Sequence, residues 1–139
     1  MNYEEEKKTH ISFCGSYCHI CDWFTGKIKN RARQMLKMVE EYNGFERVLK
    51  EKVNPEDLKT ALRLLAETKI CSGCKTEARE RCKIVVCCVS KGFSHCDECE
   101  NFPCNTLKEN PGVIKFHTIE NLLKMKKIGT KEWIDKQWK

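Results

Sequence analysis

The 139-residue sequence contains no apolar run of about 18 residues, the length that a membrane-spanning helix requires. Its first residues, MNYEEEKKTHIS, lack the basic start and the continuous apolar stretch of a secretory signal. No internal repeat or low-complexity segment is present either. We therefore expect no association with a membrane and a cytoplasmic location.

Large apolar side chains are also scarce. Leu, Ile, Val and Phe make up about 22% of the chain, close to the level of roughly 20% below which a chain tends toward disorder. The length fits one domain, because a single core usually takes about 100 to 200 residues. We predict a single domain over residues 1–139 whose thin core needs a further source of stability.

Cysteine is abundant, with 11 residues. Disulfides do not persist in a reducing cytoplasm, and an odd count would leave one thiol over, so metal ligation is favoured. Three C-x-x-C pairs, at Cys18/Cys21, Cys71/Cys74 and Cys96/Cys99, have the spacing that lets two thiolates reach one ion from a tight turn. The predicted metal ligands are Cys14, Cys18, Cys21, Cys71, Cys74, Cys82, Cys87, Cys96, Cys99 and Cys104.

Cys88 is left out of this set. It follows Cys87 in an apolar run, so its side chain is expected to point to another face and to pack in the core. Ten thiolates could form two tetrahedral zinc sites with two ligands spare, or clusters with mixed ligation. One arrangement pairs Cys18 and Cys21 with another C-x-x-C, while a second site gathers residues 82–104. Each structural zinc ion would contribute on the order of 10 kcal/mol and offset the thin core.

The apolar pattern predicts a mainly α fold with an irregular, zinc-knuckle centre. A helical insert spans 25–68, the cysteine-rich centre 71–104 and the C-terminal helices 116–138. Within the insert, one apolar stripe comprises Ile28, Ala32, Met35, Leu36, Val39 and Tyr42. A second helix is capped by Asn54, begins at Pro55, and has the inner face Leu58, Ala61, Leu62 and Leu65.

The remaining helices follow from local stop and start signals. A short helix is predicted over 79–90, ended by Gly92. Another begins at Thr118, with Ile119, Leu122 and Leu123 on one face. Gly129 ends it, and Thr130 is predicted to cap a last turn that carries Trp133, Ile134 and Trp138.

The formal charge of +6 resembles that of a nucleic-acid-binding protein, since residues 108–139 hold eight lysines against four acidic residues. Eight thiolates and two zinc ions would lower this charge to about +2, however. The lysines also alternate with acidic residues, as on a solvated surface. Nucleic acid is therefore a less favoured partner than a protein. A protein partner could contact the aromatic residues Trp23, Phe24, Phe93, Phe102 and Trp133, unless these pack inside the domain.

Histidines and acidic residues would distinguish a catalytic from a structural metal. His19 and His95 adjoin cysteines and could replace a thiolate or bond to one, whereas His10 and His117 are expected to be ordinary surface residues. Catalytic zinc needs three protein ligands, an open position and a general base, and no acidic residue stands out as that base. We therefore expect closed structural sites rather than an enzyme.

Other uses of the cysteines stay open. Thiolates also hold iron–sulfur clusters, so an electron-transfer or sensor protein is the main alternative to zinc. The spacing of Cys14, Cys18 and Cys21 matches that of radical S-adenosylmethionine enzymes over only eight residues, and a helical chain of this length lacks their partial barrel. A thiol redox enzyme is disfavoured because no βαβ pattern surrounds any C-x-x-C pair.

The cysteine pattern resembles a cysteine-rich family of unknown function from bacteria and archaea. The matching motifs are Cys14-Gly-x-x-Cys18-x-x-Cys21, Cys71-x-Gly-Cys74, Cys82-x-Ile84, Cys87 and Cys96-x-x-Cys99-x-x-Phe102-Pro103-Cys104. The segment from Leu123 to Gly129 followed by Trp133 is also similar. The resemblance implies a metal-binding domain that holds zinc, with no established reaction. From residues and resemblance together, we expect a zinc-binding interaction or scaffold module.

Overall fold

The computed structural model describes residues 1–68, 71–76 and 82–139, and it confirms a small, mainly helical fold. Within these residues, Ile11 and Tyr17 form an isolated antiparallel β-bridge, and no β-strand is formed. No helix in the same ranges is long and apolar enough to cross a membrane. None of the described cysteines is in a disulfide.

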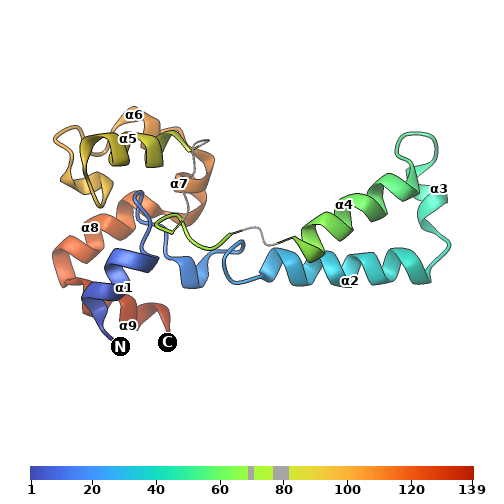
Figure 1. The fold of residues 1–139 in the computed structure, drawn as a ribbon, viewed down its shortest axis with the longest axis horizontal. Helices are drawn as coiled ribbons and strands as arrows, with labels where there is room; N and C mark the ends of the chain where they lie inside the picture. Colours follow the sequence, from blue (N-terminus) through green and yellow to red (C-terminus); the bar gives the residue numbers. More distant parts are fainter. Residues whose placement is uncertain (69–70, 77–81) are drawn as a thin grey trace. The chain divides into compact units, whose positions relative to one another are not determined.

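The helices form two compact units (Figure 1). We call Met1–Cys21 together with Ser72–Lys139 the cysteine-rich unit, and Asp22–Cys71 the helical hairpin unit. The predicted insert, 25–68, lies within the helical hairpin unit. This unit contains α2 (Lys27–Glu41), α3 (Phe45–Leu49) and α4 (Pro55–Glu67).

In the helical hairpin unit, α2 packs against α4. The predicted cap is confirmed: Asn54 Oδ1 accepts a hydrogen bond of 2.9 Å from the backbone N–H of Glu56, and Pro55 is the first helical residue. The predicted faces are wrong in part. Met35 and Ala61 are exposed, whereas Ala66 is buried. Tyr42 ends α2 and is also exposed. Two packed helices bury only a narrow stripe of each, so the margins of both predicted faces remain accessible.

The cysteine-rich unit holds the other helices. They are α1 (Tyr3–His10), η1 (Cys18–Ile20), α5 (Lys83–Lys91), η2 (Cys96–Glu98), α6 (Asn105–Lys108), α7 (Pro111–Phe116), α8 (Thr118–Ile128) and α9 (Thr130–Gln137). The helix predicted over 79–90 is observed as α5, and residues 79–81 lie outside the described residues. Gly92 ends α5 and Gly129 ends α8, as predicted, both with positive φ. The predicted cap at Thr130 is wrong by one residue, since Gly129 is the residue that precedes α9.

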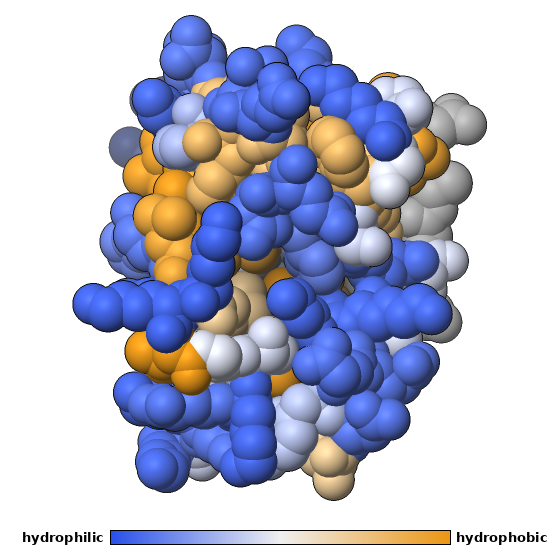
Figure 2. Space-filling view, turned by 90° about the vertical axis from the view of Figure 1, so that its left-hand side faces the viewer, coloured by the Kyte–Doolittle hydropathy of each residue, from blue (hydrophilic) through white to orange (hydrophobic). Residues whose placement is uncertain are grey.

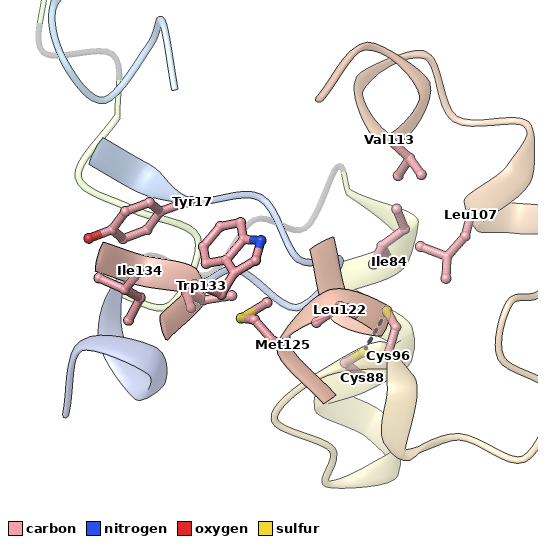
Figure 3. Packing of buried hydrophobic residues seen from close by; sticks show 11 residues of the cluster. Tyr17, Ile84, Cys88, Cys96, Leu107, Val113, Leu122, Met125, Trp133 and Ile134 are labelled. Atoms are coloured by element: carbon pink, nitrogen blue, oxygen red, sulfur yellow. Dashed lines mark hydrogen bonds between the residues drawn. The ribbon is translucent and has the colours of Figure 1, made fainter. Parts of the chain in front are cut away.

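The core of the cysteine-rich unit joins both ends of the chain to its cysteine-rich middle (Figure 3). Tyr17, Leu122, Met125, Trp133 and Ile134 are nearly or fully buried there. On α8 the inner face continues from Leu122 to Met125, one turn on. The prediction that Leu123 lies on this face is wrong, because its side chain is half exposed.

The loop at Gly15 packs directly against α8. Gly15 has φ +101°, and a Cβ atom there would lie 2.5 Å from the carbonyl oxygen of Thr118 and 2.7 Å from Leu122 Cγ. Asn121 Nδ2 also donates a 3.1 Å hydrogen bond to the carbonyl oxygen of Gly15. Glycine is therefore required at this position both for its backbone conformation and for the close approach of α8.

Replacing Gly15 tests this approach. We expect Gly15→Ala to lower the free energy of unfolding by roughly 3 kcal/mol. The added methyl group would clash with α8, and a residue with a Cβ is also strained in the left-handed backbone conformation. Gly92→Ala is the matched control, since Gly92 has φ +72° but no atom within 4 Å of an added Cβ. It should cost only about 1 to 2 kcal/mol. Urea unfolding at equal metal content measures both, and equal losses would contradict the account.

Candidate metal-binding sites

The N-terminal segment is held against the cysteine-rich middle of the chain by long-range hydrogen bonds. The backbone N–H of Cys96 donates to the carbonyl oxygen of Phe13 at 2.8 Å. His95 Nε2 lies 3.2 Å from the carbonyl oxygen of Ile11. Burial lowers the pKa of His95, so the neutral ring donates this hydrogen bond. His95 is thus a packed histidine that positions the residue beside it, Cys96.

The C-x-x-C pairs at the 3₁₀ turns η1 and η2 have the same backbone geometry. In η1 the N–H of Cys21 donates to the carbonyl oxygen of Cys18 at 3.0 Å. In η2 the N–H of Cys99 donates to the carbonyl oxygen of Cys96 at 3.1 Å. The first cysteine of each pair is buried and the second is half-buried. These are the tight turns that the C-x-x-C spacing predicts.

Five cysteines surround one cavity of about 200 Å³. We call it the thiol cavity; its cysteines are Cys87, Cys88, Cys96, Cys99 and Cys104. They come from α5, from η2 and from the residue that precedes α6. Four of the predicted ligands therefore lie around one space, together with the cysteine that sequence reasoning left out.

Cys88 and Cys96 lie closest within this cavity. Their sulfur atoms are 3.4 Å apart, and both side chains are buried (Figure 3). This separation is well beyond a disulfide bond of about 2.05 Å. It is close to the ~3.8 Å that separates two sulfurs on a tetrahedral ion with bonds of about 2.3 Å. The two thiols can therefore reach one metal ion with a small adjustment.

The expectation that Cys88 packs in the core is confirmed, since it belongs to the buried cluster. A place in the core does not exclude Cys88 as a metal ligand, however, because the core face of α5 also faces Cys96. The sequence does indicate which way Cys88 points, because Cys88 lies four residues after Ile84 and shares its helix face. In the structure Ile84 and Cys88 are both buried, whereas the adjacent Cys87 is exposed.

The two buried cysteines of the cavity have raised pKa values. Burial, followed by the hydrogen bond and charge of Cys88, raises the pKa of Cys96 well above that of an ordinary thiol. Negative charge on Cys14 and Cys104 raises it further. Burial also raises the pKa of Cys88. Thiolates so crowded become stable when a metal ion neutralises them.

The other predicted ligands have different surroundings. Cys14 Sγ lies 3.2 Å from Ser12 Oγ, and its side chain packs against the core, as does that of Cys82 at the start of α5. Cys74 belongs to the cysteine-rich unit and Cys71 to the helical hairpin unit. The grouping of these two with the N-terminal pair stays a prediction.

A second group of donor atoms lies in the N-terminal segment. Glu6 Oε2 is 3.0 Å from His10 Nδ1, and Glu6 Oε1 is 2.9 Å from His19 Nε2. One ligand atom from each of these side chains lies within 4.8 Å of the others. His10, expected to be an ordinary surface residue, is half-buried. The i, i+4 spacing of Glu6 and His10 on α1 is a sequence signal that could have indicated this group.

Comparison with known proteins places the chain in a family. No curated protein and no solved structure is significantly similar to it. The family model described as "Protein of unknown function (DUF3795)" matches residues 10–109. The matched stretch contains all the cysteines and most of the chain. The chain therefore belongs to this family of uncharacterised proteins.

Proposed function

We propose that this protein is a zinc-binding interaction module whose thiolate site is structural. The observation that carries the proposal is the pair of buried sulfur atoms of Cys88 and Cys96, 3.4 Å apart in a cavity lined by three further cysteines. Thiolates prefer zinc among the abundant divalent ions, and a four-sulfur site is closed to substrate.

We propose that the first zinc site is built around Cys88 and Cys96, which supply the preformed pair. Its other two ligands come from Cys87, Cys99 and Cys104, which line the same cavity. These cysteines lie on α5, at the η2 turn and before α6, so that one ion would connect three segments. The second predicted site, which includes Cys18 and Cys21, stays a prediction.

A structural role follows from where the pair lies. Cys88 and Cys96 are members of the buried core cluster itself. A structural zinc ion contributes about 10 kcal/mol or more of binding free energy, comparable to the whole net stability of about 5 to 15 kcal/mol of a small domain. Metal binding here would therefore be a large part of folding. Because the sites need reduced thiols, the proposal includes a reducing compartment such as the cytoplasm.

An iron–sulfur cluster is the second candidate. The observation that favours it is the size of the thiol cavity, about 200 Å³, because a single zinc ion held by four sulfurs needs little space beyond its ligands. Five cysteines around such a space could also ligate a cluster, which would make the chain an electron-transfer or sensor protein.

The interaction role rests on apolar residues at the surface. Among the aromatic residues considered from sequence, Trp133 is buried, and Phe93 and Phe102 pack against the core. Val86 and Val89, by contrast, are 49% and 64% exposed on the outer face of α5. Figure 2 shows apolar side chains among hydrophilic ones on the surface. We propose that a protein partner contacts α5, and we favour it over nucleic acid.

Metal analysis of protein purified without oxygen and without a metal-binding tag tests the function. We expect about two zinc ions per chain and no visible absorption, as thiolate–zinc sites are colourless. Removing the zinc with a strong chelator should abolish the cooperative thermal transition, and zinc should restore it. Iron with acid-labile sulfide and a broad band near roughly 400 nm would overturn the zinc assignment in favour of the cluster.

Single serine substitutions test the pair that carries the proposal. We expect Cys88→Ser and Cys96→Ser each to remove one zinc ion per chain and to lower the melting temperature, because a hydroxyl is a poor zinc ligand. Val89→Ser is the matched control, since Val89 is exposed on α5 next to Cys88. It should retain full zinc content. Unchanged zinc content in both cysteine variants would disprove ligation by this pair.

A further inference from the structure

A second, sulfur-free group of donor atoms lies at the junction of α1 and η1. Glu6 Oε2 and His10 Nδ1 are 3.0 Å apart, and Glu6 Oε1 and His19 Nε2 are 2.9 Å apart. One ligand atom from each residue lies within 4.8 Å of the others. Three donors on an ion with bonds of about 2.0 to 2.1 Å would be separated by ~3.3 Å. The two histidines contact different oxygens of Glu6, so binding an ion requires these side chains to shift around the carboxylate.

The carboxylate of this group is held by a buried partner. The hydroxyl of Tyr17 donates a 2.8 Å hydrogen bond to Glu6 Oε1, and Tyr17 is fully buried. The Tyr17 ring is 5.7 Å, between centroids, from that of Trp133 in the core. In metal sites, a carboxylate ligand is regularly held in place by a hydrogen bond from a residue that does not itself bind the metal.

Each histidine is also positioned by the fold. His10 lies one helical turn after Glu6 on α1, so both side chains project from one face. His19 lies in η1 directly after the buried Cys18, which fixes the turn. The imidazole rings of His10 and His19 are 4.6 Å apart between centroids, and that of His19 is 5.4 Å from the Trp138 ring. Two histidines from separate elements are therefore brought to one carboxylate.

We propose that Glu6, His10 and His19 bind a divalent transition-metal ion of the zinc class in a site separate from the thiolates. Two imidazole nitrogens and one carboxylate oxygen suit zinc, cobalt or nickel rather than calcium or magnesium. The side chains of His10 and His19 are 33% and 30% exposed, whereas that of Glu6 is 12% exposed. Solvent therefore reaches the histidine side of the group, and water would complete the coordination.

This coordination differs in kind from a closed cysteine site. Three protein ligands with one position left to water is the arrangement of a zinc ion that can exchange or polarise a bound molecule. Glu6 lies outside the segment that the family model matches, whereas both histidines lie within it. The proposal does not depend on the thiolate function, because no donor atom is shared.

Cobalt(II) titration of the zinc-loaded protein tests the site. Zinc first fills the thiolate sites, and a weak chelator removes loosely held ions before cobalt is added. We expect one cobalt ion per chain, with visible d–d bands but no sulfur-to-cobalt charge-transfer band. Tryptophan fluorescence should be partly quenched, because the Trp138 ring lies 5.4 Å from that of His19. Absence of saturable binding would overturn the proposal. A sulfur-to-cobalt band on the bound ion would do so as well, because it would place cobalt among the cysteines.

Matched variants assign the ligands. His10→Gln and His19→Gln should each weaken cobalt binding by at least about tenfold, since losing even a supporting partner costs about 10- to 100-fold. Glu5→Gln is the control, because Glu5 is exposed on the same helix and should bind like the parent protein. Glu6→Gln should also weaken binding, but its neutral amide accepts a weaker hydrogen bond from Tyr17 than the carboxylate does; if it fails to fold, the two histidine variants decide. Unchanged affinity in both histidine variants would disprove the site.

Discussion

The contact between Cys88 and Cys96 is the interaction on which the proposed metal site depends. Their sulfur atoms, 3.4 Å apart, join α5 to η2 inside a core that also contains Tyr17, Leu122 and Trp133. Burial favours the neutral form of both thiols, so in the absence of an ion they pack as small apolar side chains. A metal ion reverses that balance by stabilising the thiolates. Under the proposed function, coordination of an ion at this centre would add to the stability that packing supplies.

The rest of the unit brings distant parts of the chain to this centre. The N-terminal segment pairs with the residues around Cys96 through the carbonyl oxygens of Phe13 and Ile11. Gly15 allows the adjoining loop to approach α8, and Tyr3 at the start of α1 donates a 2.7 Å hydrogen bond to Asp135 on α9. The same N-terminal segment also sets Glu6 beside two histidines. The fold thus gathers two chemically different groups of side chains of the kinds that bind metals.

Features set by neighbouring residues could be predicted from the sequence, whereas features set by distant residues could not. Asn54, Gly92 and Gly129 act on their own helix ends, so their roles were readable from local chemistry. Whether Met125 or Leu123 is buried in the core depends on which residues pack against α8. Pairing of Glu6 with His19 spans two elements, and spacing along the chain carries no information about it.

The central claim is that thiolates of the cysteine-rich unit hold zinc, and X-ray absorption at the zinc edge tests it most directly. On protein purified without oxygen, the account predicts a shell dominated by sulfur at about 2.3 Å, with nitrogen or oxygen at about 2.0 Å only to the extent that the histidine site is filled. A zinc spectrum with nitrogen and oxygen neighbours alone would contradict it, because zinc would then be bound without the cysteines.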